Sequence, residues 1–457
     1  MIGYLKHKFV DRIINIFVKG HERSVKAMKN ILASFLIKGG NIAISLVLVP
    51  LTIHYINPTQ YGIWITLSSI IGWFGFFDIG LGNGLRNRFA ESVANGKHDL
   101  ARIYVSTTYA ILSIIIITVL IIFFCINPYL SWSKILNAPP HMAGELSLLA
   151  LIVFVFFCIQ LVVQLITTVL TANQQPAKAS FYNLLGSLLS LLVIYILTKT
   201  TSGNLIYLGF SLSLMPVLVL IFSSIWLYSH KYRKYAPSIK YVNFKFIPNL
   251  IGLGIKFFIL QIAVVILYQT SNIIIAQLFG PEQVTPYNIA YKYFSIVPMI
   301  MSITIMPFWS AFTEAWVKKD ILWIKNTMKK LRYFWAILST AALIMLIFSN
   351  FIYRIWIGKD IIVPASVSIV LAVYVIINAW NGIYSHFLNG VGIIRLQLYS
   401  AIFGMAVNIP MAVYFGKIIG ISGVILSTVL LGGINMVWSV IQYNKIIHFK
   451  AKGLWAK

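Results

Sequence analysis

The chain has 457 residues, of which 59% are hydrophobic and only 10% are charged, and its mean hydropathy is +0.87. A soluble protein of this length has too little interior to bury so much apolar surface, so these values exclude a soluble fold. The net charge of +26 would suggest a nucleic-acid partner for a soluble protein. In a membrane protein such cations border the anionic headgroups of the lipids instead, and we expect no nucleic-acid partner.

The first predicted element is an amphipathic helix within residues 1–29. Val10, Ile13, Ile14 and Phe17 follow helical spacing, and basic side chains lie between and beside them. This pattern is typical of a helix that lies in the cytoplasmic interface of a membrane without crossing it.

About twelve apolar stretches follow, and each is long enough to cross a bilayer as a helix, which takes about 20 residues. None shows the alternating polarity of barrel strands, so the predicted fold class is an all-α integral membrane protein. The predicted spans cover residues 30–54, 61–84, 103–126, 144–171, 178–199, 204–229, 248–279, 284–311, 331–355, 362–389, 395–414 and 419–442.

The positions of the 36 Lys and Arg residues predict how these spans are oriented. Twenty-eight of them lie in the two termini and in the alternate loops of one side, five lie on the opposite side, and three lie within spans. Because cytoplasmic loops are enriched in Lys and Arg, this asymmetry predicts that both termini are cytoplasmic.

The spans divide into two six-helix lobes, residues 30–236 and 237–457, the second ending in a short cytoplasmic tail. An even number of spans in each lobe allows the lobes to be parallel repeats about an axis along the membrane normal, and transporters of this build bind their substrate between the repeats. An offset of 223 residues pairs Pro58 with Pro281, Gln60 with Gln283, Phe89 with Phe312, and Glu91 with Glu314.

Catalysis is not expected from this sequence. The ten acidic residues lie nearly all in loops or at span ends, and the eight histidines are scattered without the spacing of metal ligands. No Gly-rich phosphate loop leads to Lys and Ser or Thr, so a nucleotide motor is excluded. Cys125 and Cys158 lie in apolar spans, where we expect core packing without a disulfide. We therefore expect no catalytic residue, no metal site and no cofactor.

Polar side chains within the spans indicate a cavity with a positive charge. A charge at mid-bilayer costs about 2.5–3.5 kcal/mol on insertion scales, so it usually faces a wet cavity or a partner. Residues at steps of four, three and four share one face of the first span, namely Ser34, Lys38, Asn41 and Ser45. Asn288, Lys292 and Ser295 share a face of the span 284–311 in the same way. We expect Lys38 and Lys292 to line the cavity.

A further polar face is predicted in the span 248–279, where it is formed by Gln261, Tyr268 and Asn272. Lys256 points some 140° away from Gln261 at 100° per residue. Two interpretations of Lys256 stay open, because it can face the cavity or extend to the cytoplasmic surface.

Asp78 is the only carboxylate deep in a span, and Arg86 lies eight residues later on the same face. We favour a structural tether for Asp78 over a site that couples transport to a proton or cation, since a carboxylate beside Arg stays ionised. Arg86 and Arg88 lie at the inner mouth of the predicted cavity. The balance of charges within the membrane is therefore positive and favours an anionic substrate.

Three motifs resemble the bacterial polysaccharide flippases, which are the O-antigen and exopolysaccharide exporters of the multidrug/oligosaccharidyl-lipid/polysaccharide superfamily. They are YGIW at 61–64, FDIGLGNGLRNR at 77–88 and NIP at 408–410. The second motif is fairly specific, and the similarity in span number, paired halves and length covers the whole chain.

This resemblance implies two helical lobes around a cationic cavity and the transfer of an undecaprenyl-diphosphate-linked oligosaccharide across the bacterial inner membrane. It implies that Lys38, Arg86, Arg88 and Lys292 meet the diphosphate or an acidic sugar, and that polymerase and chain-length proteins of the pathway are partners. Related drug exporters carry an acidic residue in the first span, which is missing here. The alternatives are an ion-coupled multidrug exporter and a membrane-embedded glycosyltransferase or O-antigen ligase.

Overall fold

The structure is a computed structural model that describes residues 22–75, 80–173, 175–248, 250, 270–306 and 308–456. All regular secondary structure in these residues is helical. The first group of helices comprises α2 (Glu22–Tyr55), α3 (Pro58–Trp73), α4 (Leu81–Ala94), α5 (His98–Ile126), α6 (Trp132–Ile135), α7 (Ala143–Val163), α8 (Leu165–Ala172), α9 (Pro176–Thr200) and α10 (Leu205–Ser229).

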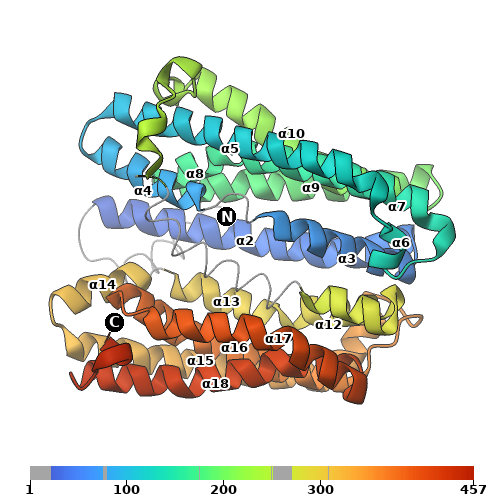
Figure 1. Cartoon of the computed structure of the whole chain (residues 1–457). Coiled ribbons are helices and arrows are strands. Elements are labelled where there is room, and N and C mark those ends of the chain that lie inside the picture. Colours follow the sequence, from blue (N-terminus) through green and yellow to red (C-terminus); the bar gives the residue numbers. More distant parts are fainter. Residues whose placement is uncertain are drawn as a thin grey trace, which may run out of the picture.

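The second group begins with the short apolar helix Thr270–Phe279. It continues with η7 (Pro281–Gln283), α12 (Val284–Phe294), α13 (Ile296–Ile305), α14 (Phe308–Val317), α15 (Ile321–Trp356), α16 (Ala365–Val391), α17 (Arg395–Ile419), α18 (Ile421–Ile447) and η8 (Gly453–Ala456). Figure 1 shows the two groups as two layers, with α2 and α3 of the first facing α12 and α13 of the second. The all-α fold in two lobes is thus confirmed.

Nine helices in the described part of the chain are long and apolar enough to cross a membrane. Three of the twelve predicted spans are not among these nine helices. The span 61–84 is divided between α3 and α4, the span 284–311 between α12, α13 and α14, and only Thr270–Phe279 represents the span 248–279.

The divisions have local causes in the sequence. Pro298 has no backbone N–H to donate to Phe294, which is the last residue of α12. Gly80 precedes α4 with a φ of 72°, a left-handed conformation that favours glycine. The predicted second span of each lobe is therefore interrupted.

Several helix starts are set by short-range capping. Asn57 accepts a hydrogen bond from the Gln60 amide at 2.8 Å, and Pro58 occupies the first turn of α3, where its missing N–H costs nothing. Asp320 caps α15 in the same manner through the Trp323 amide at 3.0 Å. α2 begins at Glu22, so part of the predicted interfacial segment 1–29 is continuous with the first span, and residues 1–21 lie outside the described residues.

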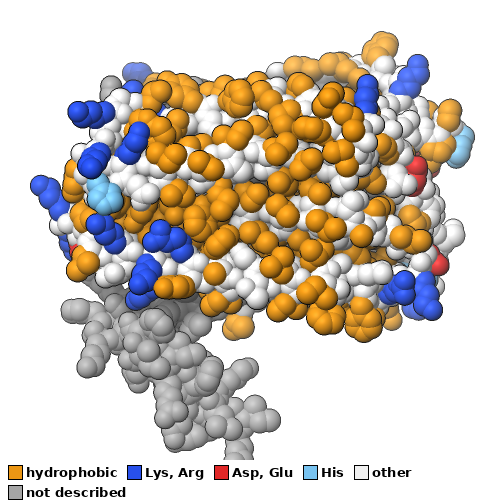
Figure 2. Space-filling view, turned by 90° about the horizontal axis from the view of Figure 1, so that it is seen from below, with side chains coloured by type: hydrophobic (Ala, Val, Ile, Leu, Met, Phe, Trp, Pro, Cys, Tyr) orange, Lys and Arg blue, Asp and Glu red, His pale blue; other side chains and the backbone are white. Residues whose placement is uncertain are grey.

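The surface matches a protein surrounded by lipid. Apolar side chains cover the middle of the face shown in Figure 2, while Lys and Arg gather at the two ends and more densely at the left one. Large apolar side chains of α15 point outward, and Ile347 is 76% exposed. Cys125 is also exposed, so the prediction that it packs in the core is wrong, whereas Cys158 is buried. An apolar span has a lipid-facing side as well as a core-facing side, and both accept Cys.

Two ends of the molecule are distinguished below. The Pro58 end carries the starts of α3 and α12 and the connection 127–142, and the Arg86 end carries α4, α14 and η8 (Figure 1). These ends correspond to the predicted outer and cytoplasmic sides.

The connection between the lobes is held against α5. It contains the short helices η4 (Arg233–Tyr235), η5 (Ile239–Tyr241) and η6 (Phe244–Phe246). Arg102 on α5 donates from Nε to the Ala236 carbonyl at 3.0 Å, and its guanidinium lies 4.1 Å from the Tyr241 ring centroid. The Asn243 amide donates to Thr107 Oγ1 at 3.0 Å. The connecting segment is therefore part of the first lobe's surface up to η6.

Candidate functional site

Two lysines lie on the seam between the lobes. Lys292 on α12 donates from Nζ to Ser45 Oγ on α2 at 3.3 Å. Lys38, two turns earlier on α2, has its Nζ 3.9 Å from the Met306 sulfur, a weak acceptor just after α13. Seven helical residues rise about 10 Å, which sets the spacing of the two contacts along α2. The predicted polar face of the first span thus faces the second lobe.

The other predicted residues of this face are placed as follows. Asn41 lies between Lys38 and Ser45 on α2 and is half-buried. Ser34 belongs to α2, but its side chain lies outside the described residues. Gln261 and Tyr268 lie outside them entirely. The same holds for Asp78 and Lys256, so their predicted roles stay predictions.

Asn272 and Asn288 are buried in a hydrogen-bonded chain between the lobes. Asn288 Nδ2 donates to Asn272 Oδ1 at 2.8 Å, and Asn272 Nδ2 donates to Ser69 Oγ on α3 at 2.8 Å. Ser69 was missed by the sequence analysis, because a serine in an apolar helix usually satisfies itself on its own backbone. It does so here as well, by donating to the Ile65 carbonyl at 2.9 Å. These hydrogen bonds join α3, the helix Thr270–Phe279 and α12 across the seam, and they satisfy both side-chain amides in this closed arrangement.

Arg86 and Arg88 are separated from the lysines and lie on α4 at the Arg86 end. Arg86 is exposed. Arg88 Nη1 contacts Glu91 Oε2 at 2.8 Å, and its side chain is 29% exposed. The structure therefore does not gather the four predicted cations in one cluster, but places two on the seam and two on α4.

The lobes touch most closely at the Pro58 end. Thr285 Oγ1 donates to the Pro58 carbonyl at 2.6 Å. A methyl group built on Gly62 would lie 1.7 Å from the Pro281 carbonyl oxygen, so only glycine fits at this point of α3. The offset of 223 residues relates Gly62 to Thr285 and Pro58 to Pro281. Each lobe therefore presents the same turn to the other, as expected for two repeats around a common axis.

Further hydrogen bonds join the lobes near this contact. Asn137 Nδ2 donates to the Ala276 carbonyl at 3.0 Å, and Gln277 Nε2 donates to the Lys134 carbonyl at 3.0 Å. Trp356 at the end of α15 donates from Nε1 to the Leu46 carbonyl at 2.8 Å. The connection 127–142 thus contacts the second lobe, and the seam is held shut at the Pro58 end.

The chemistry offered by the seam is the binding of an anion. Each ammonium group has three donors and no acceptor. Within the part of the chain that the structure describes, no carboxylate lies within 4.0 Å of Lys38 or Lys292, whereas Arg88 pairs with Glu91. An uncompensated ammonium near the membrane interior is costly, so a transient anionic partner would lower its free energy.

Comparison with known proteins agrees with this arrangement. The family described as polysaccharide biosynthesis protein matches residues 27–316, and the MatE family matches residues 257–414. A protein of Salmonella typhi named as an O-antigen transporter is 23% identical over 414 residues, which cover 88% of this chain and 91% of the relative. A protein of Yersinia pseudotuberculosis named as an O-antigen export protein is 22% identical and covers 75% of this chain and 78% of its own.

Solved structures share the fold at low sequence identity. An inward-facing multidrug resistance transporter of the MATE family has a TM-score of 0.72 at 14% identity, covering 90% of this chain and all of the other. A transporter of the same superfamily from Pyrococcus furiosus, described as having a binding pocket of reversed polarity, has a TM-score of 0.66 at 13% identity and covers 92% and 96% of the two chains. With its two-lobed helical fold and a family match over more than half its length, the chain belongs to the polysaccharide biosynthesis protein family.

Proposed function

We propose that this protein moves an undecaprenyl-diphosphate-linked oligosaccharide, the repeat unit of an O-antigen, capsule or exopolysaccharide, across the bacterial inner membrane without changing it chemically. The observation that carries this proposal is the position of Lys292 and Lys38 on the seam between the lobes, where both contact groups of the opposite lobe. Family membership and the names of the two relatives support the substrate class.

The mechanism is alternating access. In the arrangement described here the lobes meet at the Pro58 end through Thr285, Gly62 and their partners. Arg86 and Arg88 on α4 attract the diphosphate at the cytoplasmic side, and the lysines of the seam then hold it. The lobes rock apart at the Pro58 end and release the headgroup outside, while the lipid tail stays in the bilayer.

This function implies an orientation in the membrane and a set of partner proteins. Both termini lie in the cytoplasm, and the lobes 30–236 and 237–457 lie in the membrane. The polymerase and the chain-length machinery of the same pathway act on the product at the outer face. No step of the transfer breaks a bond, so the protein acts as a transporter and not as an enzyme.

The test is the location of the substrate in cells that lack the gene. Completed lipid-linked repeat units should accumulate in the cytoplasmic leaflet, and surface glycan should be lost. A ligase defect would leave the glycan in the outer leaflet, and a drug-exporter defect would leave surface glycan intact and raise sensitivity to cationic dyes. Finding the lipid-linked sugar outside in a strain without a second flippase would overturn the proposal.

A further inference from the structure

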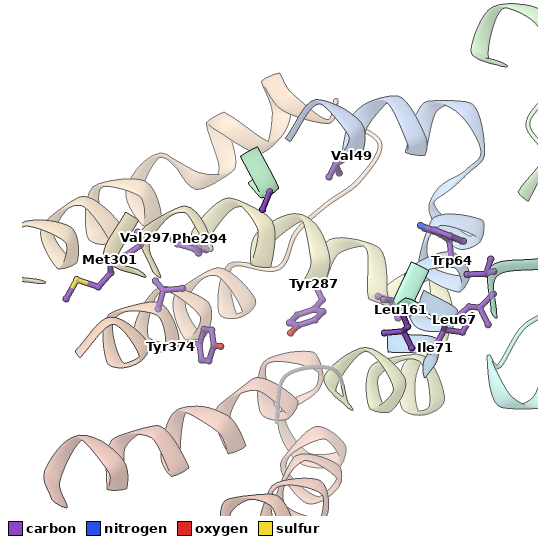
Figure 3. Close-up of a cluster of buried hydrophobic side chains, with 14 of the residues drawn as sticks. Val49, Trp64, Leu67, Ile71, Leu161, Tyr287, Phe294, Val297, Met301 and Tyr374 are labelled. Carbon is purple, nitrogen blue, oxygen red and sulfur yellow. The ribbon is translucent and has the colours of Figure 1, made fainter. Parts of the chain in front are cut away.

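A cavity of about 250 Å³ lies between α12, α13 and α16 in the second lobe. It is lined by Tyr291, Ser295, Pro298, Tyr374 and Asn378. The first three are spaced by four and three residues along α12 and α13, and the last two by four residues on α16, so each set shares one helical face. Figure 3 shows Tyr374 and the neighbouring Tyr287 projecting from different helices into the same region.

The lining combines aromatic faces with neutral polar groups. The rings of Tyr291 and Tyr374 have centroids 6.4 Å apart at an angle of 38°, and Tyr287 extends the row, with its centroid 5.9 Å from that of Tyr291. Asn378 Nδ2 donates to the Tyr374 hydroxyl at 3.1 Å. The side-chain amide and the hydroxyls can both donate and accept hydrogen bonds.

Among the described residues that line this cavity none is ionised, which distinguishes it from the lysines of the seam. Its volume lies just below the range for pockets that hold a whole ligand, which suits a part of one, and it combines apolar walls with a few convergent polar groups. A sugar ring has the matching chemistry, because one of its faces is formed by C–H groups and its edge carries hydroxyls. A phosphate group does not match a lining without a cation.

The cavity adjoins Lys292. Tyr291 precedes this lysine on α12, and Ser295 Oγ donates to the Lys292 carbonyl at 2.8 Å. At 100° per residue, the side chains of Lys292 and Ser295 leave the helix about 60° apart. A diphosphate held by Lys292 therefore places the sugar to which it is bonded next to the cavity.

We propose that the cavity lined by Tyr291, Ser295, Pro298, Tyr374 and Asn378 binds a sugar ring of the substrate, the one bonded to the diphosphate. The inference rests on the proposed function and adds to it that two separate sites bind two different parts of the substrate. The lysines of the seam bind the charge that all such lipids share, and the tyrosine-lined cavity distinguishes a glycosylated lipid from the bare carrier.

The test compares two probes on the purified full-length protein in lipid nanodiscs. One is undecaprenyl diphosphate, and the other is undecaprenyl diphosphate carrying the repeat unit extracted from the source cells. Asn378→Leu should weaken binding of the glycosylated lipid about tenfold, as expected for the loss of one hydrogen-bonding group, and change binding of the bare lipid less than about twofold. Tyr374→Phe removes a single hydroxyl without changing the ring, and should weaken only the glycosylated lipid by about threefold.

Two controls separate the possible outcomes. Tyr399→Phe makes the same change at a tyrosine of α17 that is 52% exposed, and should leave both affinities unchanged. Lys292→Ala should weaken both lipids equally. If Asn378→Leu and Tyr374→Phe affect both lipids alike, or neither, the sugar site is wrong while the flippase proposal stands. If the unaltered protein binds neither lipid, the proposed function fails and the sugar site with it.

Discussion

The two ends of the molecule differ in how the lobes meet. At the Pro58 end, the Pro281 carbonyl lies against Gly62 of α3, and the Pro58 carbonyl accepts a hydrogen bond from Thr285 of α12. Gly62 and Thr285 are related by the repeat and are distant in sequence. At the Arg86 end, a close approach joins Gly84 of α4 to Leu250, where a methyl group on the glycine would lie 2.1 Å from the carbonyl oxygen. Leu250 follows directly on the segment held against α5.

We infer from this difference which contacts break when the lobes move. Gly84 of α4 contacts Leu250, which follows closely on the connecting segment that is packed on the first lobe. This contact can therefore persist when the lobes rotate. The contacts at the Pro58 end join two separate repeats and must break before anything leaves on that side. We therefore interpret the Pro58 end as the closed gate of this conformation, and the predictions below test that comparison.

The largest effect is expected at the glycine of the gate. Gly62→Val should reduce surface glycan by roughly tenfold or more in a deletion strain complemented with the variant, because the new side chain overlaps the Pro281 carbonyl and keeps the gate from closing. Gly72→Ala on the same helix is the matched control, since nothing lies within 4 Å of its added methyl group. Normal transport by Gly62→Val would show that the gate need not close as described.

Removal of either lysine of the seam should have the next largest effect. Lys38→Ala and Lys292→Ala should each lower transport about tenfold, the size of one lost charge-assisted hydrogen bond, and Glu at either position should lower it further because it repels a diphosphate. Lys417→Ala, an exposed lysine at the Pro58 end of α17, serves as the control for charge alone. A fully active variant with Lys38→Glu and Lys292→Glu together would refute an anionic substrate.

A smaller effect on transport is expected from removal of the Thr285 hydroxyl at the gate. Thr285→Val keeps the shape of the side chain and loses the hydrogen bond to Pro58, so the closed state should be destabilised and transport should fall about threefold. Thr285→Ser retains the hydroxyl and should stay close to normal. Equal transport rates for the two variants, measured in proteoliposomes, would mean that the hydrogen bond does not stabilise the gate.

Single cysteines that test the orientation should not affect transport. Cysteines at the exposed positions Lys97, Lys240 and Lys325 should be shielded from an impermeant thiol reagent in intact cells. A cysteine at Tyr129, which is 88% exposed in the connection 127–142, should react. Pro281 lies in a connection on the same side but is unsuitable, because it is buried against Gly62. Labelling of any of the three lysine positions from outside would reverse the assignment of the two ends.

The helical class and the division into two lobes could be predicted from the sequence. Both follow from the length of each apolar segment and the Lys and Arg residues beside it, which can be read one segment at a time. It did not predict the interruptions between α3 and α4 and between α12 and α13. An apolar run such as 61–84 looks continuous on hydropathy, although Gly80 and Pro298 carried the signal. Hydropathy reports how apolar the side chains of a segment are, and it does not detect a break in the backbone of the helix.

The site was predictable to the extent that it follows helical faces. Ser45 and Lys38 share one face of α2 because of their spacing, and that face contacts the second lobe, while their role in binding stays a prediction. The partners were not predictable. Ser69 and the reciprocal contact of Gly62 with Pro281 depend on how two lobes dock, and a difference of 203 to 219 residues leaves no local trace of such a contact. The ion pair of Arg88 with Glu91 did carry a local signal, the spacing of three residues.

The segment held against α5 has a consequence for the coupling between the lobes. Because η4, η5 and η6 are fixed through Arg102 and Thr107, the segment from Arg233 to Phe246 adds no free length to the connection between the lobes. A short tether keeps the effective concentration of one lobe beside the other high, so little chain entropy is lost each time the gate closes again. Cutting the chain within 231–245 should therefore leave the lobes associated, whereas inserting flexible residues after Phe246 should slow every cycle.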